Sequence, residues 1–521
     1  MRVSHLAIGA LAAGWFAALS ACAVGPDFKR PAPPSATDYG SVSAPPAKAK
    51  TEAAANAPTD AAAQGVTPAV TETAAAGPQN FVSGMDIPSQ WWTLFQSAKL
   101  DHLVEQALKA NPNVGAAQAA LRQAHELYLA ERTSYFPNVQ GSFGGDRSEF
   151  PTNTLTSPTV ASSSTYTLYT AQLTLSYAPD VFGATRRAVE MAKAEENSTR
   201  FQLEATYLTL SSNVVVTAVQ EASLRGQITA TERLLLLQRQ LTETVQHQRV
   251  LGTASDLDVL AQQSAEAQTA QTLPPLQKQL GQTRDALTAL LGRLPSDEPE
   301  ETFRFEELTL PKDVPVSLPS KLVEQRPDVR QAEENMHAAS AAAGVAVANM
   351  LPQFAITADT GSSALKLGKL FTPYTGFWDL GASLTQTLFD AGELLHKHRA
   401  ADAALDQAGA QYRAAVILAC QNVADTLRAL QADADALKAS ADAERAAKTT
   451  FELAERQRGL GTISWVAVLN AEQAYRQAEI ALVQAQASRY SDTAGLFQSL
   501  GGGWWNRRGE PTYEQFSPPG K

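Results

Sequence analysis

The chain repeats its own sequence, and this duplication limits the possible folds more than any other feature. Asn111-Pro112-Asn113-Val114 recurs 215 positions later as Arg326-Pro327-Asp328-Val329. Residues 249–260 recur 209 positions later as residues 458–469, with Arg-x-Leu-Gly-Thr-x-Ser and a later Val-Leu in common. An offset that changes once along the chain is typical of a duplicated supersecondary unit with one insertion or deletion. We therefore expect two halves of the same architecture.

Each half contains a helical segment too long for a globular core. Residues 184–250 contain no proline and are rich in Ala, Gln, Glu and Leu, which predicts one helix of 67 residues, about 100 Å long at ~1.5 Å per residue. Gly252 marks a turn, after which the chain returns as a second helix. A plain coiled-coil rod is the alternative that these helices alone leave open. The predicted helices are residues 100–135, 184–250, 253–291, 393–458 and 463–500.

Alternating apolar and polar residues in each half predict a β-hairpin. Residues 169–177 and 378–388 alternate in this way, and shorter alternations occur at 139–143 and 354–358. Strands of about ten residues with one apolar and one polar face are typical of transmembrane barrels. Four strands cannot close a barrel, because known barrels begin at about eight. The sequence therefore predicts an oligomer, and three copies would supply twelve strands.

The N-terminus predicts export and lipid attachment. Arg2 precedes an apolar run over residues 6–19, which leads into Leu19-Ser20-Ala21-Cys22. This order predicts a signal peptide over residues 1–21. Leu-Ser-Ala-Cys also looks like a bacterial lipobox, in which Cys22 becomes the acylated first residue, with an ordinary signal peptide as the alternative. Ala23, rather than Asp, in the next position is typical of lipoproteins sorted to the outer membrane.

Few other segments carry a specific signal. Cys420 lies in a helical stretch and is expected to pack there, and lipidation of Cys22 would leave it no disulfide partner. Residues 32–80 are dominated by Ala, Pro and Thr, which predicts a flexible tether. No apolar run after the signal segment reaches the ~20 residues of a transmembrane helix, so a membrane crossing would require strands.

Composition and motifs exclude several functions. The net charge of −11 is unsuited to electrostatic binding of nucleic acid. The sequence contains no phosphate-binding loop, no nucleophile elbow and no zinc-protease motif. His396 and His398 lie on different faces of a predicted helix and make a poor metal site. We therefore expect no enzymatic activity, no cofactor and no bound metal.

Four short motifs resemble those of TolC-like outer-membrane efflux proteins, in their NodT-type lipoprotein branch. The first is the segment from Cys22 to Phe28, and the second is Trp91-Trp92. The third, Leu388-Phe389-Asp390-Ala391-Gly392, is similar to the strand-to-helix junction of the family, and the fourth, Leu500-Gly501-Gly502-Gly503-Trp504, to its closing motif. The resemblance covers residues 22–31 and 85–505.

The resemblance implies an α+β membrane protein that assembles as a trimer. Long helices would form a coiled-coil barrel across the periplasm, and four strands per protomer would form a 12-stranded β-barrel. The expected organisation is a signal peptide at 1–21, a lipid-anchored N-terminus and disordered tether at 22–84, a first repeat at 85–292, an equatorial linker at 293–325, a second repeat at 326–500 and an equatorial tail at 501–521.

The function implied by the resemblance is that of an outer-membrane exit duct in a tripartite efflux system. Such a duct would passively export drugs, toxic compounds or metal ions. Its partners would be a periplasmic adaptor protein and an inner-membrane pump of the resistance-nodulation-division type. A periplasmic structural or adaptor-like coiled-coil lipoprotein is the alternative reading of the sequence.

Two kinds of site carry over from the family. The tips between paired helices match the turn that contacts the adaptor, although their glycines would also serve as helix caps. The second tip would narrow the periplasmic aperture through Val466 and Asn470, the latter replacing the aspartate common in the family. Asp256 and Asp258 could add charge there or cap a helix behind Ser255. The expected tip residues are Leu251, Gly252, Thr253, Leu460, Gly461 and Thr462.

Overall fold

The computed structural model describes residues 23–36, 39, 79–150 and 164–507, and the chain divides into two compact units. The signal peptide, Cys22, most of the expected tether and the end of the tail lie outside the described residues. What we call the sheet unit comprises the described residues within 1–31, 121–199 and 332–412, and the helical unit those within 32–120, 200–331 and 413–521.

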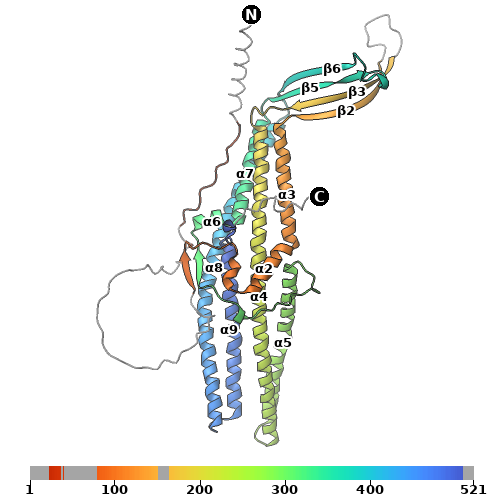
Figure 1. Ribbon diagram of the computed structural model, residues 1–521. Helices are drawn as coiled ribbons and strands as arrows, with labels where there is room; N and C mark the ends of the chain where they lie inside the picture. Colours follow the sequence, from red (N-terminus) through yellow and green to blue (C-terminus); the bar gives the residue numbers. More distant parts are fainter. Residues whose placement is uncertain (1–22, 37–38, 40–78, 151–163, 508–521) are drawn as a thin grey trace, which may run out of the picture. The chain divides into compact units, whose positions relative to one another are not determined.

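The sheet unit contains one antiparallel sheet of four strands, one hairpin from each half of the chain (Figure 1). Its order is β2-β3-β5-β6, so the two hairpins lie side by side and leave β2 and β6 as edges. The structure confirms the four predicted strands. Their bounds are Asn138–Phe150 for β2, Ser164–Tyr177 for β3, Gln353–Ala364 for β5 and Gly376–Thr385 for β6, with a 3-10 turn η6 at Leu367–Lys369.

The prediction that the last strand continues to Leu388 is wrong. Strand β6 ends at Thr385, and the side chain of Gln386 then donates a hydrogen bond of 3.2 Å to the carbonyl of Met350. Further on, the carboxylate of Asp390 accepts hydrogen bonds of 2.8 Å from the backbone N–H groups of Gly392 and Leu394. The contacts of Asp390 cap the start of the helix that begins at Glu393. The residues after Thr385 therefore bond to this helix end and to Met350 instead of extending the strand.

The long helices confirm the duplication. Helices α4 (Ala184–Val250) and α8 (Glu393–Gly459) have 67 residues each, and α5 (Asp256–Leu290) and α9 (Trp465–Ser499) have 35 each. Both pairs are offset by 209 positions. In the described part of the chain, no helix combines the length and apolar character needed to cross a bilayer.

In the helical unit, α4 contacts both α5 and α9. The amides of Gln238 and Gln262 join α4 to α5 at 2.5 Å, and those of Gln227 and Gln484 join α4 to α9 at 2.9 Å. Helix α9 also packs on α8, where the rings of Phe451 and Tyr475 stack with their centroids 6.1 Å apart. The helix order in this unit is therefore α5-α4-α9-α8.

The predicted continuous helix over residues 100–135 is wrong, because the chain breaks at Asn111. Helix α2 (Ala98–Ala110) ends there, and α3 (Pro112–Arg132) begins at the proline, followed by a 3-10 turn η3 at Thr133–Tyr135. Proline disfavours helical dihedrals in the preceding residue, and Asn111 is extended with ψ 126°. The second half repeats this break at Arg326, between α6 (Pro319–Gln325) and α7 (Pro327–Ala348).

The main apolar core lies in the helical unit and brings together two motifs from opposite ends of the sequence. Trp91, in the 3-10 helix η2 (Trp91–Phe95), stacks on Phe497 with ring centroids 5.3 Å apart. Gly503 has φ +73°, and a Cβ on it would lie 2.4 Å from the carbonyl oxygen of Ile87. Only glycine fits this approach, which leads into the 3-10 helix η7 (Trp504–Asn506).

A small parallel sheet was not predicted and corrects the end of the expected anchor and disordered tether (22–84), at residues 80–83. Strand β1 (Asn80–Ser83) pairs with β4 (Asp313–Val316), near a 3-10 turn η5 at Phe305–Glu307. Strand β1 begins at Asn80, the last residue of the segment that composition predicted to be a flexible tether. Pairing with a strand more than 200 positions away supplies hydrogen bonds that local composition cannot indicate.

Candidate functional site

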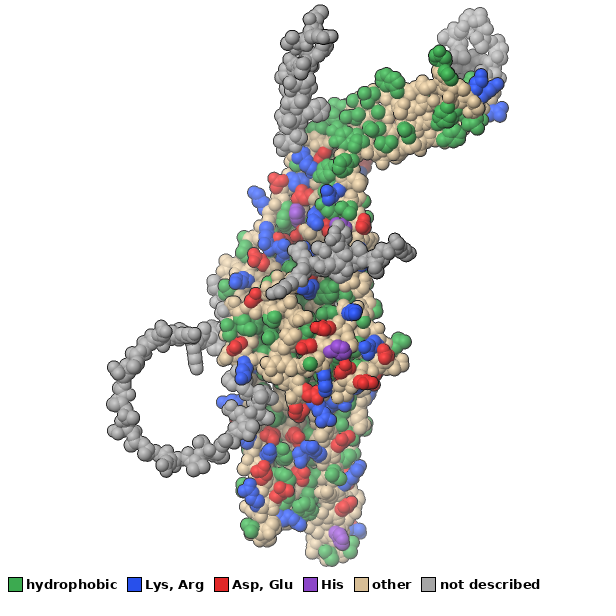
Figure 2. Space-filling view, in the orientation of Figure 1, with side chains coloured by type: hydrophobic (Ala, Val, Ile, Leu, Met, Phe, Trp, Pro, Cys, Tyr) green, Lys and Arg blue, Asp and Glu red, His purple; other side chains and the backbone are tan. Residues whose placement is uncertain are grey.

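The four-stranded sheet has one face on which apolar side chains predominate from Val139 to Phe143, Tyr169 to Tyr177, Phe354 to Ala358 and Trp378 to Leu384. The register places Leu173 of β3 opposite Gly141 of β2 and Thr360 of β5, and Phe354 of β5 opposite Leu384 of β6. Side chains of this face are exposed in the single chain, with Leu173 at 53% and Trp378 at 79%. Figure 2 shows hydrophobic side chains gathered over this sheet. Their exposure indicates a surface that another apolar environment must cover.

The opposite face of the same sheet is polar. The hydroxyl of Thr174 donates a hydrogen bond of 2.5 Å to the carboxylate of Asp359 on the neighbouring strand. Asp359 stands opposite Asp379 in the register. The remaining residues of this face include Gln140, Ser142, Thr170, Gln172, Ser176, Thr357, Ser383 and Thr385. The alternation predicted from the sequence is thus confirmed across all four strands.

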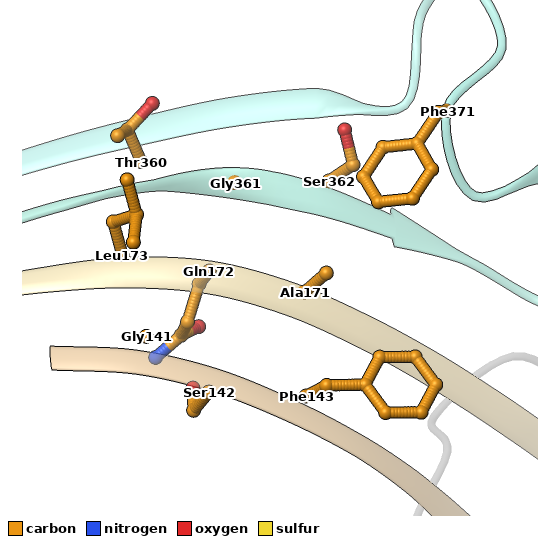
Figure 3. Close-up of a pocket in the computed structure, with 10 residues that line it drawn as sticks. All are labelled: Gly141, Ser142, Phe143, Ala171, Gln172, Leu173, Thr360, Gly361, Ser362 and Phe371. Atoms are coloured by element: carbon orange, nitrogen blue, oxygen red, sulfur yellow. The ribbon is translucent and has the colours of Figure 1, made fainter.

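A shallow hollow of about 600 Å³ lies on the sheet, between Phe143, Leu173 and Phe371 (Figure 3). Gly141 and Gly361 contribute no side chain, which leaves space between the larger groups. A Cβ on Gly361 would lie 2.3 Å from the carbonyl oxygen of Ala171, so this strand pair needs glycine. The residues that line the hollow include no titratable side chain; Ser142, Gln172, Thr360 and Ser362 supply its polar groups.

The residues that follow Cys22 are fixed to the sheet unit. The backbone N–H of Val24 donates a hydrogen bond of 3.1 Å to the carbonyl of Phe182, between β3 and α4. Asp27 accepts one of 2.5 Å from the guanidinium of Arg187, and the ring of Phe28 stacks on His337 at 4.3 Å. Cys22 itself lies outside the described residues, but its chain neighbours lie at the junction of sheet and helix.

The two helix tips have the same backbone structure. Gly252 has φ +78° and donates to the carbonyl of Arg249, and Thr253 donates to Gln248, both at 2.9 Å. These bonds form a Schellman cap. The second tip repeats them, with Gly461 bonded to Arg458 at 2.8 Å and Thr462 to Gln457 at 3.0 Å. Leu251 and Leu460 are 73% and 79% exposed. The tip glycines are therefore caps, and the leucines beside them form an exposed surface.

The first tip uses its predicted acidic residues locally. Asp258 accepts hydrogen bonds from the backbone N–H and the hydroxyl of Ser255 at 2.8 and 2.7 Å, which completes a capping box. These bonds lower the pKa of Asp258 and favour its charged form. Asp256 forms an ion pair with Arg249. The helix-capping interpretation of Asp258 is thus observed, and the structure places neither carboxylate against Val466 or Asn470.

The two residues predicted to form the aperture differ in their surroundings. Val466 is partly buried against a cluster made by Leu234, Leu237 and Leu241 of α4 with Leu469. Asn470 is exposed, one helical turn further along α9. Their spacing of four residues puts them on one side of the helix. Val466 therefore helps to hold α9 on α4, and Asn470 is the more accessible of the two.

An acidic pair between α8 and α9 was not predicted. Asp433 and Asp492 are hydrogen-bonded to each other, and burial together with this contact raises the pKa of Asp433 to about 7. Arg489, buried next to them, donates to the carbonyl of Leu430. Only contacts between distant segments reveal such a pair. Among the described residues, no group of His, Cys, Asp and Glu is arranged to hold a metal ion.

Comparisons with known proteins agree with this geometry. The model of the family described as outer membrane efflux protein matches residues 103–293 and 318–502. The pyoverdine export outer membrane protein OpmQ of Pseudomonas putida is 29% identical over 423 residues, 80% of this chain and 89% of the relative. The probable efflux pump outer membrane protein TtgC of the same species is 28% identical over 424 residues, 81% and 86%.

The fold also matches solved structures. The outer-membrane channel OprN superposes with a TM-score of 0.76 at 25% identity, over 93% of this chain and all of the other. The proteins that resemble this chain in sequence carry the names of export and efflux proteins.

The acidic pair makes the stability of the helical unit depend on pH. In the folded chain Asp433 binds its proton more tightly than its ordinary pKa of 3.8 allows. The contribution of Asp433 to stability is therefore fully present below about pH 4 and is lost as the pH rises to about 7. Asp433→Asn should flatten this dependence and raise the midpoint of thermal unfolding near pH 7.5. Scanning calorimetry at several pH values, with the exposed Asp435→Asn as control, checks this, and an unchanged slope would contradict the assignment.

Proposed function

We propose that this chain, which belongs to the outer membrane efflux protein family, forms the exit duct of a tripartite efflux system as a trimer. It is an outer-membrane efflux channel. The cargo would be drugs, other toxic compounds or metal ions that move passively through the duct. The observation that carries the proposal is a four-stranded sheet with one apolar face and two open edges. This sheet favours a duct over an adaptor-like lipoprotein.

Backbone groups at the two edges explain why more than one copy is needed. In hydrocarbon, every N–H and C=O group needs a partner, so a spanning sheet must close on itself. Pairing β6 of one copy with β2 of the next would close twelve strands with the apolar face outside and the polar face toward the lumen. Thr174, Asp359 and Asp379 would then line the water-filled interior.

The helical unit supports the same assembly. Leu257 and Leu260 of α5 are 75% and 62% exposed in the single chain. The corresponding residues of α9, Val466 and Leu469, pack against α4. If the assembly is nearly symmetric between halves, α5 would pack on α8 of the next copy as α9 packs on α4. This contact would cover both leucines and close a ring of twelve helices.

We assign two further roles to segments of the chain. The tips at Leu251–Thr253 and Leu460–Thr462 would contact a periplasmic adaptor protein, which connects the duct to an inner-membrane pump of the resistance-nodulation-division type. Acylated Cys22 would anchor the chain in the outer membrane. The position of Val24 beside the sheet-to-helix junction supports this role, because lipid attached two residues earlier would lie near the edge of the bilayer.

Charge on the apolar face tests the orientation of the sheet. Leu173→Arg or Leu384→Arg should cost about 2–4 kcal/mol if the site lies near the bilayer midplane. Thr174→Arg and Thr385→Arg place the same group on the polar face and should be much milder. Yield of heat-modifiable trimer in outer-membrane fractions measures the difference. Equal yields for all four variants would show that the faces are assigned wrongly.

Lipid attachment is tested at Cys22. Cys22→Ser should prevent acylation and impair sorting, while part of the protein still inserts, because one lipid chain binds membranes only marginally and the sheet provides most of the retention. Intact-mass measurement of the mature chain and fractionation of the membranes report the two effects. An unmodified Cys22 in the wild-type chain would contradict the anchor.

The aperture is tested by conductance in planar bilayers. Three carboxylates from Asn470→Asp should raise cation selectivity and introduce block by divalent cations from the periplasmic side. Val466→Ser should raise the conductance of the closed state. Ala261→Asp adds the same charge at the corresponding position of α5 and serves as the matched control. If Asn470→Asp behaves like the parent, the aperture lies elsewhere, with Asp256 and Asp258 as the next candidates.

A further inference from the structure

The two tips have the same backbone but differ in charge over fourteen corresponding residues. Residues 247–260 of the first tip contain one arginine and two aspartates, a net charge of −1 with His247 neutral. The corresponding residues 456–469 of the second tip contain two arginines and no carboxylate, a net charge of +2. Surfaces duplicated in structure therefore differ by three charges over the same fourteen positions.

One of these three charge differences lies beside an arginine that both tips share. In the first tip Arg249 forms an ion pair with Asp256. In the second tip Arg458 lies over the ring of Trp465, 4.3 Å from its centroid. Arg249 corresponds to Arg458 and Asp256 to Trp465, each 209 positions apart. A carboxylate neutralises its arginine, whereas an indole stabilises the cation and leaves its charge in place.

The local contacts of one charged side chain differ between the two tips. In the second, Arg456 pairs with Glu452 at 3.8 Å, so Arg458 is the arginine without a compensating carboxylate. In the first, Asp258 keeps its charge, because its hydrogen bonds to Ser255 lower its pKa. Each of these charges lies in the same tip as an exposed leucine, Leu251 or Leu460.

We propose that the tips are two distinct docking sites for one adaptor protein, whose surface carries a carboxylate where it covers Arg458 and a cation where it covers Asp258. This inference rests on the proposed duct function. Apolar contact with Leu251 and Leu460 would give both sites their common affinity. The charges would set which part of the adaptor binds which tip, because complementary charge contributes more to specificity than to affinity. A partner with uniform charge would be repelled at one of the two sites.

The test uses the full-length trimer with a photo-cross-linking amino acid in place of Leu251 or Leu460. The probes are two synthetic helical hairpins with the same apolar tip, flanked by glutamates in one and by lysines in the other. The glutamate hairpin should cross-link about threefold more at position 460, and the lysine hairpin about threefold more at position 251. Both preferences should disappear at about 0.5 M salt, which screens exposed charges.

Exchanging the corresponding residues makes the test specific. Trp465→Asp gives Arg458 a carboxylate partner and should remove the preference for the glutamate hairpin. Asp256→Trp frees the charge of Arg249 and should remove the preference for the lysine hairpin. Arg445→Gln removes one positive charge from the exposed surface of α8, away from the tip, and should leave both preferences unchanged.

The outcomes separate this inference from the duct function. Equal cross-linking of the two hairpins at both tips, or preferences that survive the exchanges, would overturn the charge assignment. Export is measured independently as the accumulation of a fluorescent dye in cells that lack the gene and in cells that carry it again. Export with equal cross-linking would contradict only the assignment of the tips, whereas absence of export would contradict the duct itself.

Discussion

Backbone hydrogen bonding at the edges of the four-stranded sheet is the constraint on which the rest of the structure depends. Strands β3 and β5 are paired on both sides, but β2 and β6 each pair on one side only among the residues that the structure describes. An outer-membrane protein cannot leave these groups in hydrocarbon without a cost of several kcal/mol for each. Closure by other copies would satisfy them and would also bury the exposed apolar side chains in lipid. The proposed oligomer therefore follows from the fold.

Because of the duplication, each chain supplies two copies of the same unit to the assembly. Each half supplies a hairpin, a 67-residue helix and a 35-residue helix, joined at a tip with the same Schellman cap. Because the halves share a backbone, their differences are confined to side chains. In the tip of one half an aspartate faces the arginine, and in the other an indole does. A structure that is nearly symmetric can in this way present two different surfaces to a partner.

Much of the architecture could be predicted from the sequence because it depends on local chemistry. The proline-free segment 184–250 coincides with α4, and the alternation around Leu173 identifies β3 and both its faces. Other features depend on contacts between distant segments and could not be predicted. The Asp433–Asp492 pair and the β1–β4 sheet are of this kind. The break at Asn111 was predictable, because proline disfavours helical dihedrals in the residue before it. It was missed because the segments on both sides of Pro112 are rich in good helix formers.

Amide hydrogen exchange of the assembled protein in lipid nanodiscs tests the central claim most directly. Closure predicts that the outward-facing N–H groups of the edge strands β2 and β6 exchange as slowly as those of the inner strands β3 and β5, because another copy pairs with them. Fast exchange confined to β2 and β6, with β3 and β5 protected, would mean that the sheet keeps free edges. That result would contradict a duct closed by strands from three copies.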